Sequence, residues 1–520
     1  MLAIIIGALA LFFLLLRPLY NYFRHRANAR RLNCRPPHTK HYKWPFGIDG
    51  IRRLEQADKR DMVCDEFFTI YKEEGAATFQ HWLFGQRQIM TAEPRNVQAI
   101  LATQFSDFEI PVIRQNSFWP MLGQGIFTAN GQIWSHSRAI LRPQFTRQQV
   151  SDLELEEKHV QQLLMHIKPD PATGWAQPTN LGPLFFRLTI DSATEFLFGQ
   201  SVESQLQALP GAMSETNPAH NWRNLAHHFD DGTNHLAKRA RFSDLYWLHN
   251  PAEFRKDCEE VHRFADHFVQ QALERTIAEE KAEAAGAEKK RYVFLHELIK
   301  ETKDPIELRC QLLHILLAGR DTTAGLLGWT FFLLSRHPAI YQKLRETILE
   351  TFGPYDSPRD ITFERLKACT YLQHVLQETL RLYPSVPLNS RMATKDTTLP
   401  TGGGPDGTSP IYVAKGEQVG YAVYVMQRRK DIWGPDADQF VPERWATRKA
   451  GWEYLPFNGG PRICLGQQFA LTEAGYVTTR LVQLFDNITA VYPDEVDKHQ
   501  YSVTSAPKAV LVNLHTAQAA

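Results

Sequence analysis

A ten-residue stretch near the end of the chain, from Phe457 to Gly466, limits the possible folds more than any other part of the sequence. It reads Phe-Asn-Gly-Gly-Pro-Arg-Ile-Cys-Leu-Gly, and the apolar run after it, 465–485, is typical of a helix. Cys464 would lie near the positive end of that helix, where backbone amides and the helix dipole favour an anionic sulfur. The glycines allow the backbone to bend tightly and to approach a large, flat ligand. We therefore expect the chain to fold around a ligand that is held at this loop.

One cofactor, haem, accounts for these features together. Arg462, two residues before the cysteine, is placed to reach an anionic substituent of the ligand. A cysteine thiolate bound axially to haem iron donates electron density that favours cleavage of the O–O bond of dioxygen. The sequence therefore predicts a haem–thiolate site in which Cys464 binds the iron.

This stretch resembles the haem-binding loop of the cytochrome P450 superfamily, whose pattern is F-x-x-G-x-R-x-C-x-G. Phe457, Gly460, Arg462, Cys464 and Gly466 fill every fixed position of that pattern. An isolated cysteine is more often a buried, inert side chain, but five fixed residues at set spacings disfavour that alternative. The resemblance implies a mainly α-helical fold with small β-sheets, the cytochrome P450 fold, that binds haem b.

The longest apolar helical pattern, 308–334, contains the segment Ala-Gly-Arg-Asp-Thr-Thr at 318–323. Glycine, aspartate and two threonines are poor choices inside a helix, which predicts a local function such as an opening that holds water or a ligand. An acid next to an alcohol can deliver protons to bound dioxygen. The segment matches the superfamily's oxygen-activation motif, which implies that Asp321 and Thr322 form the proton-delivery pair. A core helix bent by its threonines is the alternative.

Glu378 and Arg381 lie three residues apart in a predicted helix, 363–382, and so share one face of it. Most such pairs are surface bridges worth under ~1 kcal/mol. The resemblance implies instead a buried pair behind the haem, completed by Arg444 of the Pro-Glu-Arg-Trp segment at 442–445. Such a network is costly to break at any member.

Trp134 and Arg138 are four residues apart in a predicted helix, 132–145, and share one face. In isolation they predict a packing or cation–π contact. The resemblance implies that both contact a haem propionate. It also implies that Arg391 reaches a propionate and that 386–390 lines the pocket above the haem.

The first residues predict a membrane anchor. Leu2 to Leu16 is an unbroken apolar run, and six arginines follow between positions 17 and 35. As a helix the run spans only about 22 Å, but extension to Phe23, with Arg17 reaching the interface, suffices for a thin bilayer. A cleaved signal peptide and a buried core helix are the alternatives. The positive-inside rule leaves the rest of the chain cytoplasmic. We predict an anchor at 1–23 in the endoplasmic reticulum membrane, a basic, proline-containing linker at 24–50, and a catalytic domain at 51–520.

Other patterns complete the expected fold. Helices are predicted at 61–74, 181–198 and 254–284, a β-hairpin at 77–91, and closing β-hairpins at 488–514. The segment 201–250 is expected to be irregular, and its histidines show no metal-ligand spacing. The six cysteines are scattered without a CxxC pair, which disfavours a disulfide or zinc scaffold, and the net charge of +1 gives no reason to expect nucleic acid as a partner.

Three stretches, 316–324, 402–407 and 456–468, resemble the fungal branch of the superfamily that hydroxylates n-alkanes and fatty acids at the ω position. The resemblance implies a monooxygenase that uses O2, a lipophilic substrate and electrons from NADPH–cytochrome P450 reductase. Animal fatty-acid hydroxylases often carry a haem-esterified glutamate where Ala318 stands, so its absence implies a non-covalently held haem. A basic region at 428–430 and 448–449 is expected to dock the acidic reductase, unless it is only a solvated loop.

Other functions stay open at this point. The chain could hydroxylate another lipophile, such as a xenobiotic or a secondary metabolite. It could be a haem-thiolate isomerase or dehydratase, which the intact Asp321–Thr322 pair disfavours, or a non-catalytic haem sensor. Dependence on NADPH distinguishes the monooxygenase from the last two classes.

Overall fold

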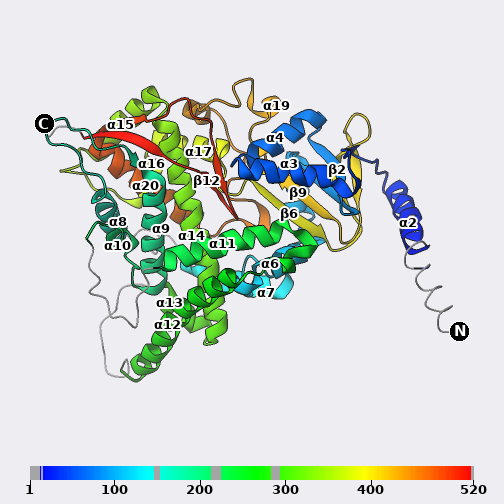
Figure 1. Cartoon of the computed structure of the whole chain (residues 1–520), viewed down its shortest axis with the longest axis horizontal. Helices are drawn as coiled ribbons and strands as arrows, with labels where there is room; N and C mark the ends of the chain where they lie inside the picture. Colours follow the sequence, from blue (N-terminus) through cyan, green and yellow to red (C-terminus); the bar gives the residue numbers. More distant parts are fainter. Residues whose placement is uncertain (1–11, 13–15, 146–152, 212–223, 283–292, 517–520) are drawn as a thin grey trace.

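The computed structural model describes residues 12, 16–145, 153–211, 224–282 and 293–516. Helices make up most of these residues, and the strands form four small sheets (Figure 1). The predicted class, mainly α-helical with small β-sheets, is therefore confirmed.

The long helix α14 (Pro305–Leu334) runs through the middle of the molecule (Figure 1). It begins at Pro305, and the Asp304 carboxylate accepts the backbone N–H groups of the first turn, which caps the helix. Because apolar residues occur all round α14, it is buried on every side rather than along one stripe. Its most extensive helix contacts are with α9 (Leu181–Phe198), α12 (Ala252–Ala282), α17 (Thr370–Leu382) and α20 (Gln467–Leu484).

The largest sheet has six strands and brings distant parts of the chain together. Strands β3 and β9 pair in parallel and align Gln88 with Gln418, and strands β6 and β9 pair antiparallel and align Arg391 with Val419. This register fixes the position of Arg391 in the sheet. The spatial order is β1 (His38–Thr39), β2 (Thr78–Leu83), β3 (Gln86–Thr91), β9 (Gln418–Ala422), β6 (Leu388–Ala393) and β4 (Phe108–Glu109).

The remaining elements surround this framework. The smaller sheets pair β5 (Thr179–Asn180), β10 (Phe485–Ala490) and β13 (Leu511–Thr516), then β7 (Thr397–Gly403) with β8 (Ser409–Val413), and β11 (His499–Tyr501) with β12 (Ser505–Pro507). The other helices are α2 (Arg17–Arg31), α3 (Ile48–Lys59), α4 (Val63–Glu74), α5 (Pro94–Gln98), α6 (Val112–Leu122), α7 (Gly131–Leu141), α8 (Leu153–Leu164), α10 (Ser204–Gln207), α11 (Leu225–Arg241), α13 (Phe294–Glu301), α15 (Pro338–Phe352), α16 (Phe363–Ala368), α18 (Val423–Met426) and α19 (Lys430–Trp433).

Most predicted elements are present with small boundary shifts. The helix expected at 181–198 is α9 with the same limits, and the one at 308–334 is α14, which begins three residues earlier. The helix expected at 363–382 is interrupted at Cys369 and forms α16 and α17. The expected opening of α14 at 318–323 is absent, since the helix is continuous there.

The expectation that 201–250 is irregular is wrong for its second half. Helix α11 forms because Leu225, Phe229 and Leu236 share one buried face. Its histidines obscured that pattern in the sequence. They make ordinary polar contacts, such as His228 Nδ1 to Asp257 Oδ1 at 2.8 Å and His235 Nδ1 to His249 Nε2 at 2.8 Å. His220 lies outside the described residues.

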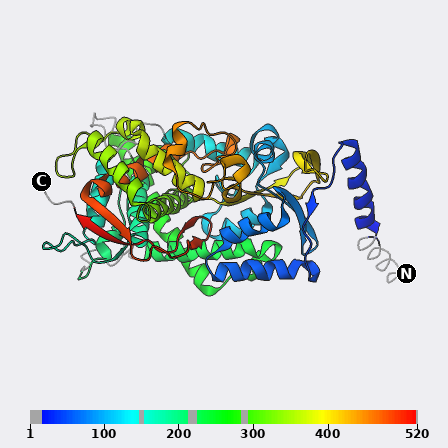
Figure 2. The same cartoon turned by 90° about the horizontal axis from the view of Figure 1, so that it is seen from above.

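Helix α2 stands at the periphery of the molecule, beside the hairpin of β7 and β8 (Figures 1 and 2). It is tied there by His25 Nδ1 to the Tyr412 hydroxyl at 2.9 Å and by Asn28 Nδ2 to Asp396 Oδ2 at 2.9 Å. Among the described residues, no helix combines the length and the apolar character needed to cross a membrane. Most of the predicted anchor, 1–11 and 13–15, lies outside those residues.

Candidate functional site

A cavity of about 520 Å³ lies at the centre of the fold. Its walls come from α6, α7, α9, α11, α14, β6 and the loop that precedes α20. Most of the lining is apolar, with Phe118 and Leu197 as examples. The cavity unites eight of the residues singled out from the sequence, namely Trp134, Arg138, Thr322, Arg391, Phe457, Arg462, Cys464 and Gly466.

The cysteine loop is closed by its own backbone. The Cys464 N–H donates to the Phe457 carbonyl at 3.0 Å, and the Ile463 N–H donates to the Gly460 carbonyl at 3.0 Å. Gly460 has a φ of +67°, and a Cβ there would lie 1.9 Å from the carbonyl oxygen of Leu101. Only glycine satisfies both conditions. The loop thereby presents the cysteine to the cavity directly before α20.

The Cys464 thiol has an accessible surface, but that surface faces the cavity, and protein surrounds the group on its other sides. Desolvation raises the pKa of this thiol above its ordinary value, while the Gly466 amide and the charge of Arg138 lower it in part. Without a cation the site therefore favours the thiol, and a bound metal ion would favour the thiolate. This is the donor chemistry that a haem iron requires.

Trp134 and two arginines form the wall next to the loop. The Arg462 guanidinium lies over the Trp134 ring at 4.3 Å from its centre and donates to the Ala129 carbonyl at 3.0 Å. Arg138, one turn further along α7, donates from Nη1 to the Ile463 carbonyl at 3.0 Å. Helix α7 and the cysteine loop are thus joined directly at the cavity.

Four arginines line the same cavity without a carboxylate partner among the described residues: Arg114, Arg138, Arg391 and Arg462. Burial and the charges of the other three lower the pKa of Arg462 to about 9, and burial with the charge of Arg391 lowers the pKa of Arg114 to about 10. A cluster of partly buried, mutually repelling cations favours a bound anion. The two propionates of a haem supply that charge, so the residues present fit the cofactor.

Arg114 was missed by sequence reasoning. It comes from α6, and its guanidinium shares the Oδ1 atom of Asn389 with Arg391, whose Nη1 lies 3.1 Å from that oxygen. Its only sequence signal is a lone cation directly after the apolar run Ile110-Pro-Val-Ile113. No motif connects it with the strand that it meets in the fold.

The proposed proton-delivery pair is split by the cavity wall. Thr322 lines the cavity, and its hydroxyl donates to the Ala318 carbonyl at 2.6 Å, one turn earlier in α14. Asp321 is not a lining residue, and its Oδ1 accepts from Arg320 Nη1 at 3.0 Å. Burial raises the pKa of the Asp321 carboxyl to about 6, although the charge of Arg320 opposes that rise.

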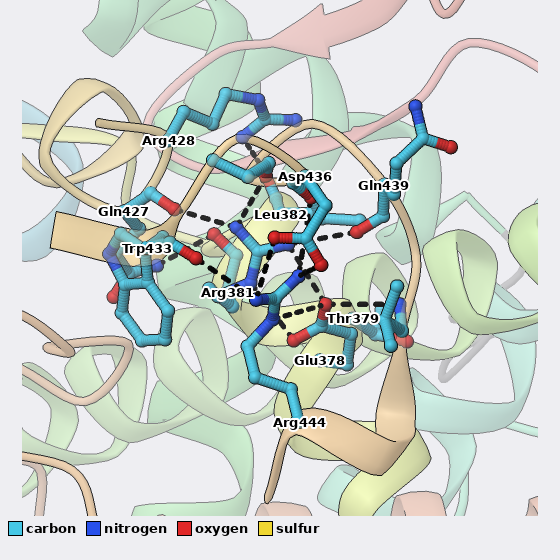
Figure 3. Close-up of polar contacts among 12 residues, drawn as sticks. Glu378, Thr379, Arg381, Leu382, Gln427, Arg428, Trp433, Asp436, Gln439 and Arg444 are labelled. Atoms are coloured by element: carbon cyan, nitrogen blue, oxygen red, sulfur yellow. Dashed lines mark hydrogen bonds and ion pairs between the residues drawn. The ribbon is translucent and has the colours of Figure 1, made fainter. Parts of the chain in front are cut away.

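Glu378, Arg381 and Arg444 form a buried network of ion pairs (Figure 3). The Arg381 side chain makes two 2.9 Å contacts with the Glu378 carboxylate, and both residues have no exposed surface. Arg381 also donates to the carbonyls of Gln427, Ala437 and Gln439 at 2.7–3.0 Å. Arg444 Nε lies 3.4 Å from Glu378 Oε1.

This network reaches the cysteine loop through Gln427. The Gln427 side chain donates to the Arg381 carbonyl at 2.9 Å and accepts the Leu455 N–H at 2.8 Å. Because Leu455 lies two residues before Phe457, α17 and the loop are joined by one short chain of hydrogen bonds. The three residues themselves do not line the cavity.

The basic region expected to dock a reductase is smaller than its sequence indicates. Arg428 is buried and lies 3.7 Å from the centre of the Tyr424 ring, so it cannot contact a partner. Arg429 Nη1 pairs with Glu93 at 2.9 Å. Lys430 and Lys449 are exposed, and Arg448 is partly exposed.

Comparison with known proteins identifies relatives over most of the chain. Residues 51–513 match the family model described as Cytochrome P450. Cytochrome P450 monooxygenase g430 of Fusarium sp is 53% identical over 481 residues, which are 92% of this chain and 84% of that protein. Cytochrome P450 monooxygenase alt2 of Alternaria solani is 45% identical over 95% of this chain and 92% of that protein. Cytochrome P450 52A13 of Debaryomyces hansenii is 48% identical over 90% of this chain and 89% of that protein.

Proposed function

The chain belongs to the cytochrome P450 family, and from that premise we propose that it hydroxylates the terminal methyl group of a long-chain n-alkane or fatty acid. As a member of this family it is a haem-thiolate monooxygenase that takes O2, a lipophilic substrate and electrons from a redox partner. The largely apolar cavity that ends at Cys464 is the observation that carries the proposed substrate class. The stretches that resemble the fungal ω-hydroxylase branch support it.

Haem bound in the cavity would supply the oxygen-activating chemistry, and the Cys464 sulfur would hold its iron. The chain supplies the surroundings. Arg114, Arg138, Arg391 and Arg462 would hold the propionates, and the apolar walls exclude water from the substrate chain. The Thr322 hydroxyl lies at the cavity wall. It can donate its proton while its oxygen accepts a proton from a neighbouring group. Asp321, with its raised pKa, is the group that replaces that proton.

The cavity also contains a cation suited to the head group of a fatty acid. Arg241, the last residue of α11, lines the cavity but is not among the arginines that lower the pKa of Arg462. Its side chain is 37% exposed, so it lies at the edge of the cavity, where its Nη1 pairs with Asp58 at 2.6 Å. Because that exposed pair contributes little, a substrate carboxylate can compete for the guanidinium. The methyl end would then point inward.

Replacing Arg241 by methionine is expected to raise the KM for a fatty acid about tenfold, equivalent to ~1.4 kcal/mol, and to leave the KM for an n-alkane unchanged. The measurement is steady-state hydroxylation of both substrate types. Lys238→Met is the matched control, because Lys238 is a cation on the same helix that does not line the cavity. An equal rise in KM for alkane and fatty acid would show that Arg241 shapes the cavity rather than binding the carboxylate.

We further propose that the chain is held at the endoplasmic reticulum membrane by 1–23, with 24–50 as linker and 51–520 as the catalytic domain. An exposed apolar surface supports contact with lipid. Its two parts are the tip of the β2–β3 hairpin and the short helix at Ser243–Leu248, and Gln86 of the hairpin donates to Asp244 of that helix. The exposed side chains are Trp82, Phe84, Leu245, Trp247 and Leu248.

The proposed electron donor is NADPH–cytochrome P450 reductase. The exposed cations Lys430 and Lys449 support docking of an acidic partner, although the burial of Arg428 weakens that support.

Product analysis tests the proposed function. Microsomes that contain the protein and the reductase are given NADPH and a panel of C12 to C18 alkanes and fatty acids. We expect terminal alcohols whose formation stops under carbon monoxide. An intact thiolate haem without terminal products would refute the substrate class and direct the search to bulkier lipophiles. Turnover without NADPH would instead indicate an isomerase or dehydratase.

A further inference from the structure

One guanidinium in the centre of α14 is shared by two carboxylates. Arg320 Nη1 donates to Asp321 Oδ1 at 3.0 Å and also to Asp230 Oδ1, which comes from α11. The side chains of Arg320 and Asp321 are 2% and 5% exposed, whereas that of Asp230 is 47% exposed. Asp230, Arg320 and Asp321 therefore form a connected group that extends from the solvent to Asp321, the residue next to the cavity-lining Thr322.

Arg320 is held in this position by its packing. The guanidinium carbon lies 5.2 Å from the centre of the Phe186 ring of α9 and 5.7 Å from that of Phe229 of α11. The Nε atom is buried without a hydrogen-bond partner among the described residues. The guanidinium thus lies close to two rings, and the two carboxylates are the acids that it contacts.

The sharing has an electrostatic consequence for Asp321. Two carboxylates on one guanidinium carry a net charge of −1 when both are ionised, so a proton is readily taken up by one of them. Asp321 is the more buried of the two and is therefore the better site for that proton. Arg320 of α14 and Asp230 of α11 are the charged groups that shift its pKa, and α9 presents the Phe186 ring to the same guanidinium.

We propose that Asp230 is a positioning residue for proton delivery, because it shares Arg320 with Asp321 and so keeps Asp321 able to take up a proton. The proposal rests on the proposed role of Asp321 and Thr322. In each cycle the Asp321 carboxyl gives its proton toward the Thr322 hydroxyl and becomes a carboxylate. A proton from the bulk solvent, which reaches the half-exposed Asp230, then restores the Asp321 carboxyl. The charge of Arg320 stays unchanged throughout.

Asp230→Asn tests this role. With Asp230 neutral, Arg320 pairs with Asp321 alone, so the pKa of Asp321 falls and less of it is protonated at neutral pH. The protonated fraction is lost as pH rises through the pKa, so a lower pKa moves this loss to lower pH. We expect product formed per NADPH to fall several-fold at pH 7.5, with hydrogen peroxide released instead, and to recover toward acid pH. When product formed per NADPH is plotted against pH, the midpoint should shift by ~1 pH unit to lower pH.

The neighbouring residue provides the control. Asp231→Asn makes the same charge change one position later on α11, at a side chain that is 44% exposed and pairs with His227 at 3.4 Å. We expect the product formed per NADPH, and its dependence on pH, to match those of the unmodified protein. Equal losses in the Asp230 and Asp231 variants would overturn the proposal, since they would show a general effect of surface charge.

A spectroscopic titration provides a readout independent of turnover. The infrared band of the protonated Asp321 carboxyl, assigned by its absence in Asp321→Asn, is followed against pH in the substrate-free holoenzyme. The midpoint of this titration should be lower in Asp230→Asn and unchanged in Asp231→Asn. Coinciding midpoints in the unmodified protein and these two variants would refute the inference. If Asp321→Asn itself keeps normal coupling, the proposed role of Asp321 fails and this inference with it. If Asp321→Asn is uncoupled while Asp230→Asn is normal, only the inference fails.

Discussion

Glu378→Ala is expected to yield a protein that does not retain haem. The change leaves the Arg381 guanidinium buried without its carboxylate, and removing one partner of a buried pair costs about 3–5 kcal/mol. The same carboxylate accepts hydrogen bonds from the Val441 N–H and the Trp445 indole, which also lose their acceptor. Since Arg381 and Gln427 connect α17 with the cysteine loop, we expect the loop to lose its position. The ferrous–CO absorbance per polypeptide should fall to background. We expect the same loss of absorbance in Arg381→Ala.

A surface pair with the same spacing is the control. Glu297 and Lys300 lie three residues apart on α13 at 2.7 Å, with side chains 35% and 65% exposed. Glu297→Ala should cost less than ~1 kcal/mol and leave the ferrous–CO spectrum unchanged. Glu378→Gln, which keeps the shape and one acceptor oxygen, should retain haem in part. A normal spectrum in Glu378→Ala would refute the structural role of the network.

The parts of the site that could be predicted from sequence are those encoded by short contiguous spacings. Arg462 and Cys464 are two residues apart, and Trp134 and Arg138 are four apart, so each pair can be recognised from a short stretch of sequence. The fold brings all four residues to one cavity. Arg114 could not be found in this way. It meets Arg391 only because α6 and β6 converge on Asn389, and that convergence depends on packing across 275 residues of chain.

Local patterns also mislead where tertiary contacts override them. Three consecutive cations at 428–430 are typical of a solvated surface. Arg428 is nevertheless buried, packs against the rings of Tyr383 and Tyr424, and donates to the Leu382 carbonyl. The polar residues at 318–323 predicted an opening in α14. The helix continues there because the Thr322 hydroxyl finds its acceptor within the helix and Asp321 pairs with Arg320.

Gly460→Ala is expected to abolish the thiolate-ligated haem while leaving the rest of the fold intact. The new Cβ would lie 1.9 Å from the Leu101 oxygen and 2.8 Å from its carbonyl carbon. These are backbone atoms, so no side-chain rotation relieves the overlap, and the loop itself must shift. Because the Gly460 carbonyl accepts the Ile463 N–H, a shift at Gly460 displaces the residue next to Cys464. We expect more than a tenfold loss of the ferrous–CO absorbance of thiolate-ligated haem, with far-ultraviolet circular dichroism unchanged.

A second glycine separates the steric overlap from backbone strain. Gly407, in the turn between β7 and β8, has a φ of +68°, against +67° at Gly460, but a Cβ there meets nothing within 4 Å. Gly407→Ala therefore carries only the strain of a left-handed alanine, about 1–2 kcal/mol, and should keep a normal spectrum. If both variants lose the thiolate spectrum equally, strain rather than the contact with Leu101 is responsible. If neither loses it, the loop can move without displacing Cys464, and the 1.9 Å approach does not govern ligation.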